Sequence, residues 1–256
     1  MKIKLEIENA IKEMGFVDLT DIQKQTIPLL LQGKDVIGNS RTGTGKTAAF
    51  GIPILEMIDF DSESIQAIIV TPTRELAVQI KGEMLRMSKY ITKCKIVDVF
   101  GGEIITRQLR DLRKKPQIVV GTPGRILDHI NRKTIRLDHL KYFILDEADE
   151  MLKMGFIEDI ETIFNSTPEI KQTLMFSATF SQDIRRLAKS LVADPVEISV
   201  TPRNTTVEAI IQRVFPVDKK QKSRLLSFLI KENNWSQELV FCKTKNGSNK
   251  LTKYLE

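Results

Sequence analysis

The chain has 256 residues, of which 41% are hydrophobic and 28% charged, the composition of a soluble globular protein. It contains no apolar run long enough to span a bilayer, and its first residues lack the apolar core of a signal peptide, so a cytoplasmic location without membrane contact is expected. The net charge of +6 does not by itself indicate nucleic-acid binding. Residues 1–202 hold 28 basic and 28 acidic residues, and residues 203–256 hold 11 and 5.

Strands and helices are predicted to alternate along residues 1–200. Apolar residues at helical spacing predict helices at 7–14, up to 31, up to about 58, and at 74–91, 104–112, 124–130, 151–152, 157–164 and 182–191. Short apolar runs predict strands at 35–38, 66–71, 95–100, 117–120, 142–145, 173–176 and 196–200. Several strands are apolar on both faces, which is typical of a parallel sheet with helices on both faces, so the predicted fold class is α/β.

Residues 201–207 are polar and are predicted to link this first domain, residues 1–200, to a second α/β domain at 208–256. Strands are predicted there at 210–217 and 238–242, and helices at 219–230 and 247–255. Because two strands and two helices cannot cover both faces of a parallel sheet, the second domain is expected to be incomplete. Its apolar residues would lack a sheet to pack on: Leu225, Leu226, Phe228, Leu229, Leu239, Val240 and Phe241. We expect this part to be disordered, to pack on the first domain, or to self-associate.

The stretch Ser40–Thr47 follows a predicted strand and runs into a predicted helix, as a phosphate-binding loop requires. Its glycines would let backbone N–H groups face phosphate oxygens, Lys46 would add charge, and the Thr47 hydroxyl would bind Mg²⁺. The general pattern has glycine where this chain has Ser40. The alternative is a glycine-rich turn that only begins a helix.

A second stretch, Asp146-Glu147-Ala148-Asp149, lies at the carboxyl end of a predicted strand, where open α/β sheets bind ligands. Asp146 could hold Mg²⁺ directly or through water, and Glu147 could accept a proton from an attacking water. The alternative is an acidic helix N-terminus, which is common. The two cysteines, Cys94 and Cys242, have no second ligand at metal spacing and are expected to be reduced thiols. No metal-ligand spacing accompanies His129 or His139 either, and both are expected to be surface or boundary residues.

With these two stretches, an ordered set of motifs resembles the DEAD-box ATP-dependent RNA helicases of superfamily 2 over the whole chain. The set comprises 15–23, 40–47, 72–79, 101–102, 122–125, 146–149 and 177–179. The resemblance implies an N-terminal RecA-like domain of the P-loop NTPase type. Residues 239–245 resemble the first motif of the family's second RecA-like domain, which would be truncated here. The sequence around 217–245 is most similar to the bacterial E-type RNA helicases.

The resemblance implies ATP and Mg²⁺ as cofactors. Gln23 would read adenine through its amide, and Phe16 would lie near the base. The upstream aromatic residue of the family would fall before Met1, so we expect that contact to be missing. The phosphates and metal would be held by Arg41, Thr42, Gly43, Thr44, Gly45, Lys46 and Thr47. Catalysis would depend on Lys46, on Asp146 as a metal ligand, partly through water, and on Glu147, which positions the water. Ser177 and Thr179 would bond to Asp149 and couple nucleotide to RNA, although their hydroxyls could instead cap the strand end.

The resemblance also implies RNA as the partner. The sugar–phosphate backbone would be contacted by Pro72, Thr73, Arg74, Gly101, Gly102, Thr122, Pro123, Gly124 and Arg125. Small residues let RNA approach, and the arginines and helix N-termini supply positive partners, so binding would show little sequence preference. Arg107, Arg110 and Lys114 share a helix face that either extends this track or is a solvated basic face.

The expected activity is RNA-dependent ATP hydrolysis with local separation of RNA duplexes. In the family, arginines of the second domain stabilise the transferred phosphoryl group, and this chain ends before they would appear. We therefore expect these 256 residues to bind ADP or ATP–Mg²⁺, to hydrolyse ATP slowly and not to unwind RNA alone. The alternatives are a nucleotide-dependent RNA-binding module or clamp without productive catalysis, and a DNA helicase of the same superfamily. The intact stretches 15–23 and 72–79 argue against the latter.

Overall fold

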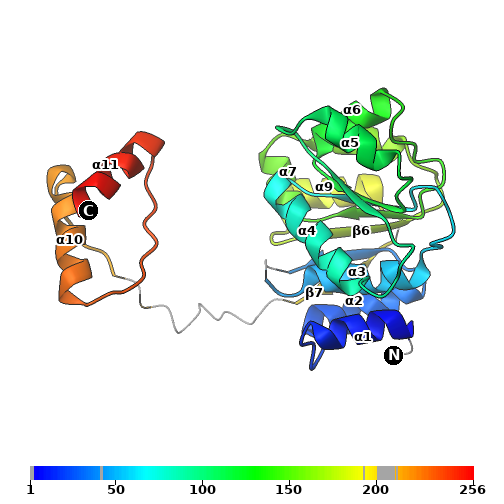
Figure 1. Cartoon of the computed structure of the whole chain (residues 1–256), viewed down its shortest axis with the longest axis horizontal. Coiled ribbons are helices and arrows are strands. Elements are labelled where there is room, and N and C mark those ends of the chain that lie inside the picture. The colour runs from blue at the N-terminus through cyan, green and yellow to red at the C-terminus, as the bar shows by residue number, and fades with distance from the viewer. Residues whose placement is uncertain (1–2, 41–42, 193, 201–210, 212) are drawn as a thin grey trace. The chain divides into compact units, whose positions relative to one another are not determined.

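The computed structural model describes residues 3–40, 43–192, 194–200, 211 and 213–256. The chain divides into two compact units, Met1–Arg203 and Asn204–Glu256 (Figure 1). The division falls inside the predicted linker, 201–207, whose conformation lies outside the described residues.

The first unit is built on a seven-stranded sheet in the order β3-β4-β2-β5-β6-β1-β7. The strands are β1 (Val36–Asn39), β2 (Ala67–Val70), β3 (Ile96–Val99), β4 (Ile118–Gly121), β5 (Tyr142–Leu145), β6 (Gln172–Ser177) and β7 (Val196–Ser199). Every neighbouring pair of these strands is parallel. The sequence-predicted strands of residues 1–200 are therefore confirmed to within two residues at their ends, as is the α/β fold class.

The sheet is buried on both faces because its strands are apolar at successive positions. In β2, the side chains of Ala67 and Ile69 belong to one hydrophobic core and those of Ile68 and Val70 to the other. Side chains that alternate along a strand point to opposite faces, so a continuous apolar run serves two cores at once.

Nine helices accompany this sheet among the described residues. They are α1 (Leu5–Glu13), α2 (Asp21–Leu31), α3 (Lys46–Met57), α4 (Arg74–Met87), α5 (Ile105–Leu112), α6 (Pro123–Asn131), α7 (Ala148–Lys153), α8 (Ile157–Asn165) and α9 (Gln182–Leu191). Helices α1 to α4 contribute to the first core, and α5 to α9 contribute to the second. Figure 1 shows α1, α2 and α3 lying together. The largest differences from the prediction are α7, which is six residues long rather than two, and α4, which ends at Met87 rather than at residue 91.

The second unit contains a short 3₁₀ turn, Lys219–Gln221, followed by α10 (Lys222–Glu232) and α11 (Lys245–Leu255). Both predicted helices are confirmed, but the strand predicted at 238–242 is wrong, since these residues form no ladder. Residues 210 and 212 of the other predicted strand lie outside the described residues, and its remaining residues are not in a strand. A strand requires a neighbour to pair its N–H and C=O groups, and none is present among the described residues of this unit.

The apolar residues of this unit stay accessible. Leu239 is 81% exposed and Phe241 is 88% exposed, and no described residue of the unit is buried. Packing on the first unit and self-association therefore stay predictions. Among the helices of the described residues, none combines the length and apolarity needed to cross a membrane.

Candidate nucleotide and RNA site

The carboxyl ends of the parallel strands share one edge of the sheet, and every predicted site segment except 15–23 begins there. The phosphate loop follows β1, Ser177 ends β6 and Asp146 follows β5, and these three strands are neighbours. The predicted RNA segments follow β2, β4 and β3, which form the adjoining part of the sheet. We call the part of the edge at β5, β6 and β1 the nucleotide half and the part at β2, β4 and β3 the RNA half, after the binding predicted for their segments, and the two parts meet between β5 and β2.

The phosphate loop is shaped by two glycines in left-handed conformation, Gly43 at φ 80° and Gly45 at φ 90°, and α3 begins directly after them. Ser40, which departs from the general motif, is buried at the start of the loop. Its N–H donates to the carbonyl of Ser177 at 3.0 Å, and its hydroxyl hydrogen-bonds the hydroxyl of Thr44 across the loop. Serine at this position therefore closes the loop. Arg41 and Thr42 lie outside the described residues.

The charged centre of the nucleotide half is a buried ion pair. Lys46 Nζ lies 3.4 Å from Asp146 Oδ1, and both side chains are almost fully buried. Lys46 Nζ also donates to the carbonyl of Ser40 at 3.4 Å. The long distances leave the ammonium able to move toward an incoming anion, since charge-assisted hydrogen bonds close to 2.7–2.9 Å at their optimum.

Two carboxyl groups at this centre have shifted pKa values. Burial raises the pKa of Asp146, and the Lys46 ammonium partly opposes this shift. Burial also raises the pKa of Glu147, and the neighbouring Asp146 charge adds to it. Glu147 adopts the left-handed conformation at φ 57°, ψ 50° immediately before α7. Such a conformation costs a non-glycine residue on the order of 1–2 kcal/mol and turns the side chain out of the strand direction.

The residues present fit a hydrated Mg²⁺ ion. Asp146 Oδ1 accepts the Glu147 N–H at 3.1 Å and pairs with Lys46, and both contacts are on one carboxylate oxygen. A buried carboxylate with a raised pKa is stabilised by a cation, and Mg²⁺ typically takes one or two protein oxygens beside phosphates and waters. The described residues hold no cluster of three or more His, Cys, Asp or Glu that would make an all-protein metal cage. Thr47, in the first turn of α3, is half-buried.

Gln23 is buried and is hydrogen-bonded to the phosphate loop. It is 1% exposed, its Oε1 accepts the Thr20 N–H at 2.9 Å, and its Nε2 donates to the Gly45 carbonyl at 3.0 Å. An amide has two donors and two acceptor sites, so one of each is left for a base. Phe16 is half-buried and packs against the first core, so its proximity to a base stays a prediction.

The contacts predicted for Asp149 are found in part. Thr179 Oγ1 donates to Asp149 Oδ2 at 3.1 Å, and the Ala178 N–H donates to Asp149 Oδ1 at 3.3 Å. The expected bond from Ser177 is not formed, because its hydroxyl donates to the Thr179 carbonyl at 2.7 Å instead. Ser177 thus caps the end of its own strand, which is the alternative interpretation. Asp149 instead accepts hydrogen bonds from Ala178 and Thr179, the two residues that follow Ser177.

In the RNA half, the predicted segments form two helix N-termini and a turn. Thr73 caps α4 by accepting the Leu76 N–H at 3.2 Å, Thr122 precedes α6 with Pro123 in its first turn, and Gly102 has φ 80°. The N–H groups of such termini are suited to phosphate oxygens. Arg74 is exposed and pairs with Glu75 at 2.7 Å, which restrains but does not bury its guanidinium.

The guanidinium of Arg125 is hydrogen-bonded by residues that were not predicted for this role from the sequence. Its Nη1 donates to Gln108 Oε1 at 3.2 Å and to the Glu103 carbonyl at 3.4 Å. Gln108 also contacts His129, and both are fully buried. The expectation that His129 is a surface or boundary residue is therefore wrong, whereas His139 is exposed as expected. The sequence signal that could have found Gln108 is a polar residue on the apolar side of an amphipathic helix, one turn from Leu112.

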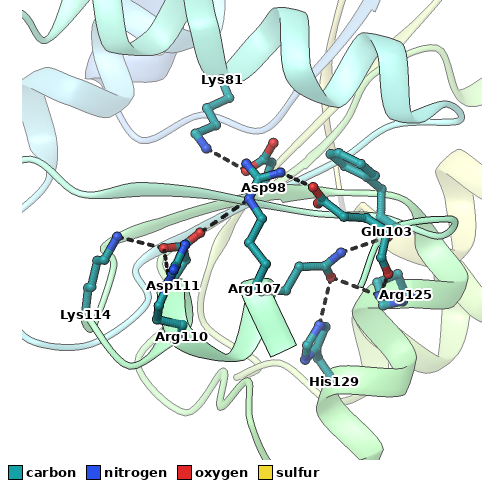
Figure 2. A network of polar contacts seen from close by, with 11 residues as sticks. Lys81, Asp98, Glu103, Arg107, Arg110, Asp111, Lys114, Arg125 and His129 are labelled. Atoms are coloured by element: carbon teal, nitrogen blue, oxygen red, sulfur yellow. Dashed lines mark hydrogen bonds and ion pairs between the residues drawn. The ribbon is translucent and has the colours of Figure 1, made fainter. Parts of the chain in front are cut away.

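The basic face of α5 is largely neutralised by its neighbours. Arg107 pairs with Glu103 and, at 3.9 Å, with Asp111, and Lys114 pairs with Asp111 at 2.7 Å (Figure 2). Arg110 lies 3.9 Å from the same carboxylate. Ion pairs of this kind are typical of a solvated helix face. That the basic face of α5 extends the RNA track therefore stays a hypothesis.

A parallel sheet with a phosphate loop after one strand and an aspartate after another, two positions away, defines a RecA-like nucleotide-binding domain of the P-loop class. The chain belongs to the DEAD/DEAH box helicase family, whose sequence model matches residues 20–187. It is 48% identical to the DEAD-box ATP-dependent RNA helicase CshA of Bacillus cereus, over 96% of this chain and 47% of that protein. It is 47% identical to the ATP-dependent RNA helicase CshA of Listeria monocytogenes, over 98% of this chain and 48% of that protein.

Solved structures agree with this assignment. A DEAD box protein from the hyperthermophile Methanococcus jannaschii matches with a TM-score of 0.76 and 43% identity, over 100% of this chain and 68% of that one. A hypothetical ATP-dependent RNA helicase from Sulfolobus tokodaii matches with a TM-score of 0.72 and 42% identity, over 77% of this chain and 57% of that one. The chain spans about half the length of the curated relatives. The finer likeness to the E-type helicases stays a prediction.

Proposed function

We propose that this chain is the ATP-binding and RNA-contacting part of an ATP-dependent RNA helicase. The observation that carries the proposal is the buried Lys46–Asp146 pair, 3.4 Å apart beside a glycine-rich loop to which Gln23 is hydrogen-bonded. A buried pair of this kind is costly unless its charges serve a ligand, because desolvation offsets much of the attraction. A triphosphate for Lys46 and a hydrated Mg²⁺ for Asp146 would satisfy both charges.

The residues of the nucleotide half can be given distinct tasks. The N–H groups of the loop and Lys46 would bind phosphate oxygens, and Asp146 and Thr47 would hold the metal, which supplies charge stabilisation when bound. Glu147 would orient the attacking water and accept its proton. Its raised pKa makes it a better base near neutral pH than an ordinary glutamate. The Asp149–Thr179 contact would connect nucleotide state to the RNA half.

The RNA half would contact the sugar–phosphate backbone through the two helix N-termini, Gly101–Gly102, Arg74 and Arg125. These groups address phosphate and sugar, so little sequence preference is expected. We also propose that the second unit is the start of the family's second RecA-like domain and that the protein is cytoplasmic, where its two free thiols would persist.

We further propose that the 256 residues alone bind ATP but turn it over slowly. In the described part of the site Lys46 provides the positive charge, and in this family further arginines are expected from the second domain. Arginines of that kind are worth about 10³–10⁵ in rate. A clamp without productive catalysis is the alternative.

Nucleotide binding and ATP hydrolysis, each measured with and without RNA, test these proposals. A fluorescent ADP analogue should bind the chain, and Lys46→Met should abolish that binding. Glu147→Gln should retain nucleotide binding and lower any turnover by about 10²–10⁴, the contribution of a general base. Turnover that is unaffected by Glu147→Gln would favour the clamp, and binding that survives Lys46→Met would refute the nucleotide site.

A further inference from the structure

A polar cluster is buried directly beneath the RNA half of the edge. Gln108 of α5 is 1% exposed and His129 of α6 is 0% exposed. Neither side chain can reach RNA, because both are enclosed by the first unit. Buried polar side chains are retained at a cost unless their hydrogen bonds are satisfied, so the partners of this cluster indicate what it does.

The Gln108 amide joins three separate segments. Its Nε2 donates to the carbonyl of Phe100 at 3.0 Å, and its Oε1 accepts from Arg125 Nη1 at 3.2 Å. The same Oε1 lies 3.1 Å from His129 Nε2. A carbonyl can only accept and a guanidinium can only donate, so the amide fits in one orientation and a flipped amide would meet two mismatched partners.

This orientation fixes the proton of His129. Because Gln108 Oε1 is an acceptor, Nε2 of His129 must carry a hydrogen. The single hydrogen of the Thr134 hydroxyl can be donated either to Nδ1, at 2.8 Å, or to the His129 carbonyl, at 3.0 Å. In a neutral ring with the hydrogen on Nε2, Nδ1 accepts it. Burial, followed by the nearby Arg125 charge, lowers the pKa of His129, which agrees with a neutral ring.

The segments joined by Gln108 are the ones expected to contact RNA. Phe100 is the last residue before Gly101–Gly102, and Arg125 is the arginine of the segment after β4. Arg125 Nη1 also donates to the carbonyl of Glu103 at 3.4 Å. Arg125 is therefore connected to the residue on each side of the two glycines, directly to Glu103 and through Gln108 to Phe100. One amide thereby sets the distance between the Gly101–Gly102 turn and the Arg125 guanidinium.

We propose that Gln108 is a positioning residue that holds Arg125 and the Gly101–Gly102 turn in register for successive phosphates of one RNA strand, with His129 holding the amide in place. This inference rests on the proposed RNA contact of Arg125. An arginine whose guanidinium is fixed by one nitrogen keeps its other donors directed and loses less side-chain freedom when it binds phosphate.

The test measures binding of a labelled single-stranded uridine oligonucleotide by fluorescence anisotropy over a range of salt concentrations. The proteins are the wild-type chain, Gln108→Met, Arg125→Met and the double variant. Gln108→Met should weaken binding about as much as Arg125→Met, roughly three- to tenfold, and lower the salt slope by about 0.7, the value for one phosphate contact to a single strand. The double variant should bind no more weakly than Arg125→Met alone, because both changes remove the same contact.

Two controls separate positioning from folding. Gln32→Met changes an exposed glutamine at the end of α2 and should leave RNA binding unchanged. Binding of the fluorescent ADP analogue in the other half of the edge should be the same in all variants. If Arg125→Met weakens binding but Gln108→Met does not, or if their effects add, the positioning role is refuted. If Arg125→Met itself has no effect, the proposed RNA contact fails, and the inference fails with it.

A measurement on the unchanged chain does not depend on any variant folding. The sequence holds two histidines, so a long-range ¹H–¹⁵N spectrum of their ring nitrogens shows the buried His129 beside the exposed His139 as internal reference. At about pH 7.5, His129 should be the neutral Nε2–H tautomer, and its ring signals should shift when RNA is added. An Nδ1–H tautomer, which leaves Nε2 without a hydrogen for Gln108 Oε1, would contradict the orientation of Gln108 and overturn the proposal.

Discussion

Replacement of Gly45 by alanine tests whether the phosphate loop is held by Gln23. Gly45 lies at φ 90°, and a methyl group there would overlap Gln23 Nε2, which donates to the Gly45 carbonyl at 3.0 Å. Gly43, two residues earlier, has the similar φ of 80°, but no atom from the described part of the chain lies within 4 Å of an added methyl group. Gly43→Ala is therefore a matched control that has the same backbone strain without the overlap.

The expected magnitudes follow from these contacts. A left-handed conformation costs an alanine about 1–2 kcal/mol, and this applies to both variants. In Gly45→Ala the displaced Gln23 also loses its bond to the loop, worth about 0.5–1.5 kcal/mol, and disturbs its acceptance of the Thr20 N–H at the start of α2. We expect Gly45→Ala to lower the free energy of unfolding by about 2–4 kcal/mol and Gly43→Ala by about 1–2 kcal/mol.

Urea unfolding followed by circular dichroism, without nucleotide, measures both values. A third comparison places Gly45→Ala in a Gln23→Ala background, where the overlap is removed. There its cost should fall to that of Gly43→Ala. Equal costs for the two glycine variants, or an unchanged cost of Gly45→Ala in the Gln23→Ala background, would refute the idea that Gln23 holds the loop.

Three further predictions concern other parts of the chain. The pKa of His129 is lowered by burial, so below its ordinary value of 6.5 the unfolded chain takes up a proton that the folded chain does not. The free energy of unfolding should therefore fall by up to about 1.4 kcal/mol between about pH 7.5 and pH 5.5. Urea unfolding of His129→Gln at both pH values should show that this part of the pH dependence is lost. An unchanged pH dependence in the variant would show that His129 does not titrate this way. Burial raises the pKa of Cys94 to about 11, so a disulfide reagent at about pH 8 should modify the exposed Cys242 quickly and Cys94 slowly; two fast thiols, or a fast thiol that survives Cys242→Ser, would contradict this. Because the cations of α5 are internally paired, neutralising Arg107 and Arg110 together to glutamine should leave the salt slope of RNA binding unchanged, and a decrease of about 0.7 or more would place this face on the RNA track.

The sequence was informative where local pattern and fold agree. Short apolar runs between segments of helical spacing predicted every strand of the first unit. Strands of a parallel sheet are buried on both faces, so nearly all of their residues must be apolar. The ordered motifs predicted which strand ends carry the site. Their adjacency along the edge, with a nucleotide half and an RNA half, depends on strand order, which crossover connections decide and which no local pattern contains.

The predictions that failed depended on partners far away in sequence. The strand at 238–242 has strand-forming residues but no neighbour among the described residues, so its pattern alone could not form a ladder. Ser177 was expected to bond with Asp149, but a carbonyl two residues away is nearer to its hydroxyl than a residue on α7. The burial of His129 does not follow from the local sequence, because the amide that satisfies its ring lies on another helix, 21 residues away.

The strand ends determine how rigidly the two halves of the site are joined. The ladder continues one residue beyond several strands, so that the residue that begins a site segment, or the one directly before it, donates its N–H to the neighbouring strand. Such bonds run from Thr122 to Val99, from Thr71 to Gly121, from Asp146 to Val70 and from Ser40 to Ser177. Backbone positions in both halves are therefore part of one hydrogen-bonded edge, which packed cores on each face keep from shifting. The proposed coupling of nucleotide and RNA within this unit would then depend on side chains and on the loops beyond the ladder, and the Asp149–Thr179 contact is one such side-chain contact.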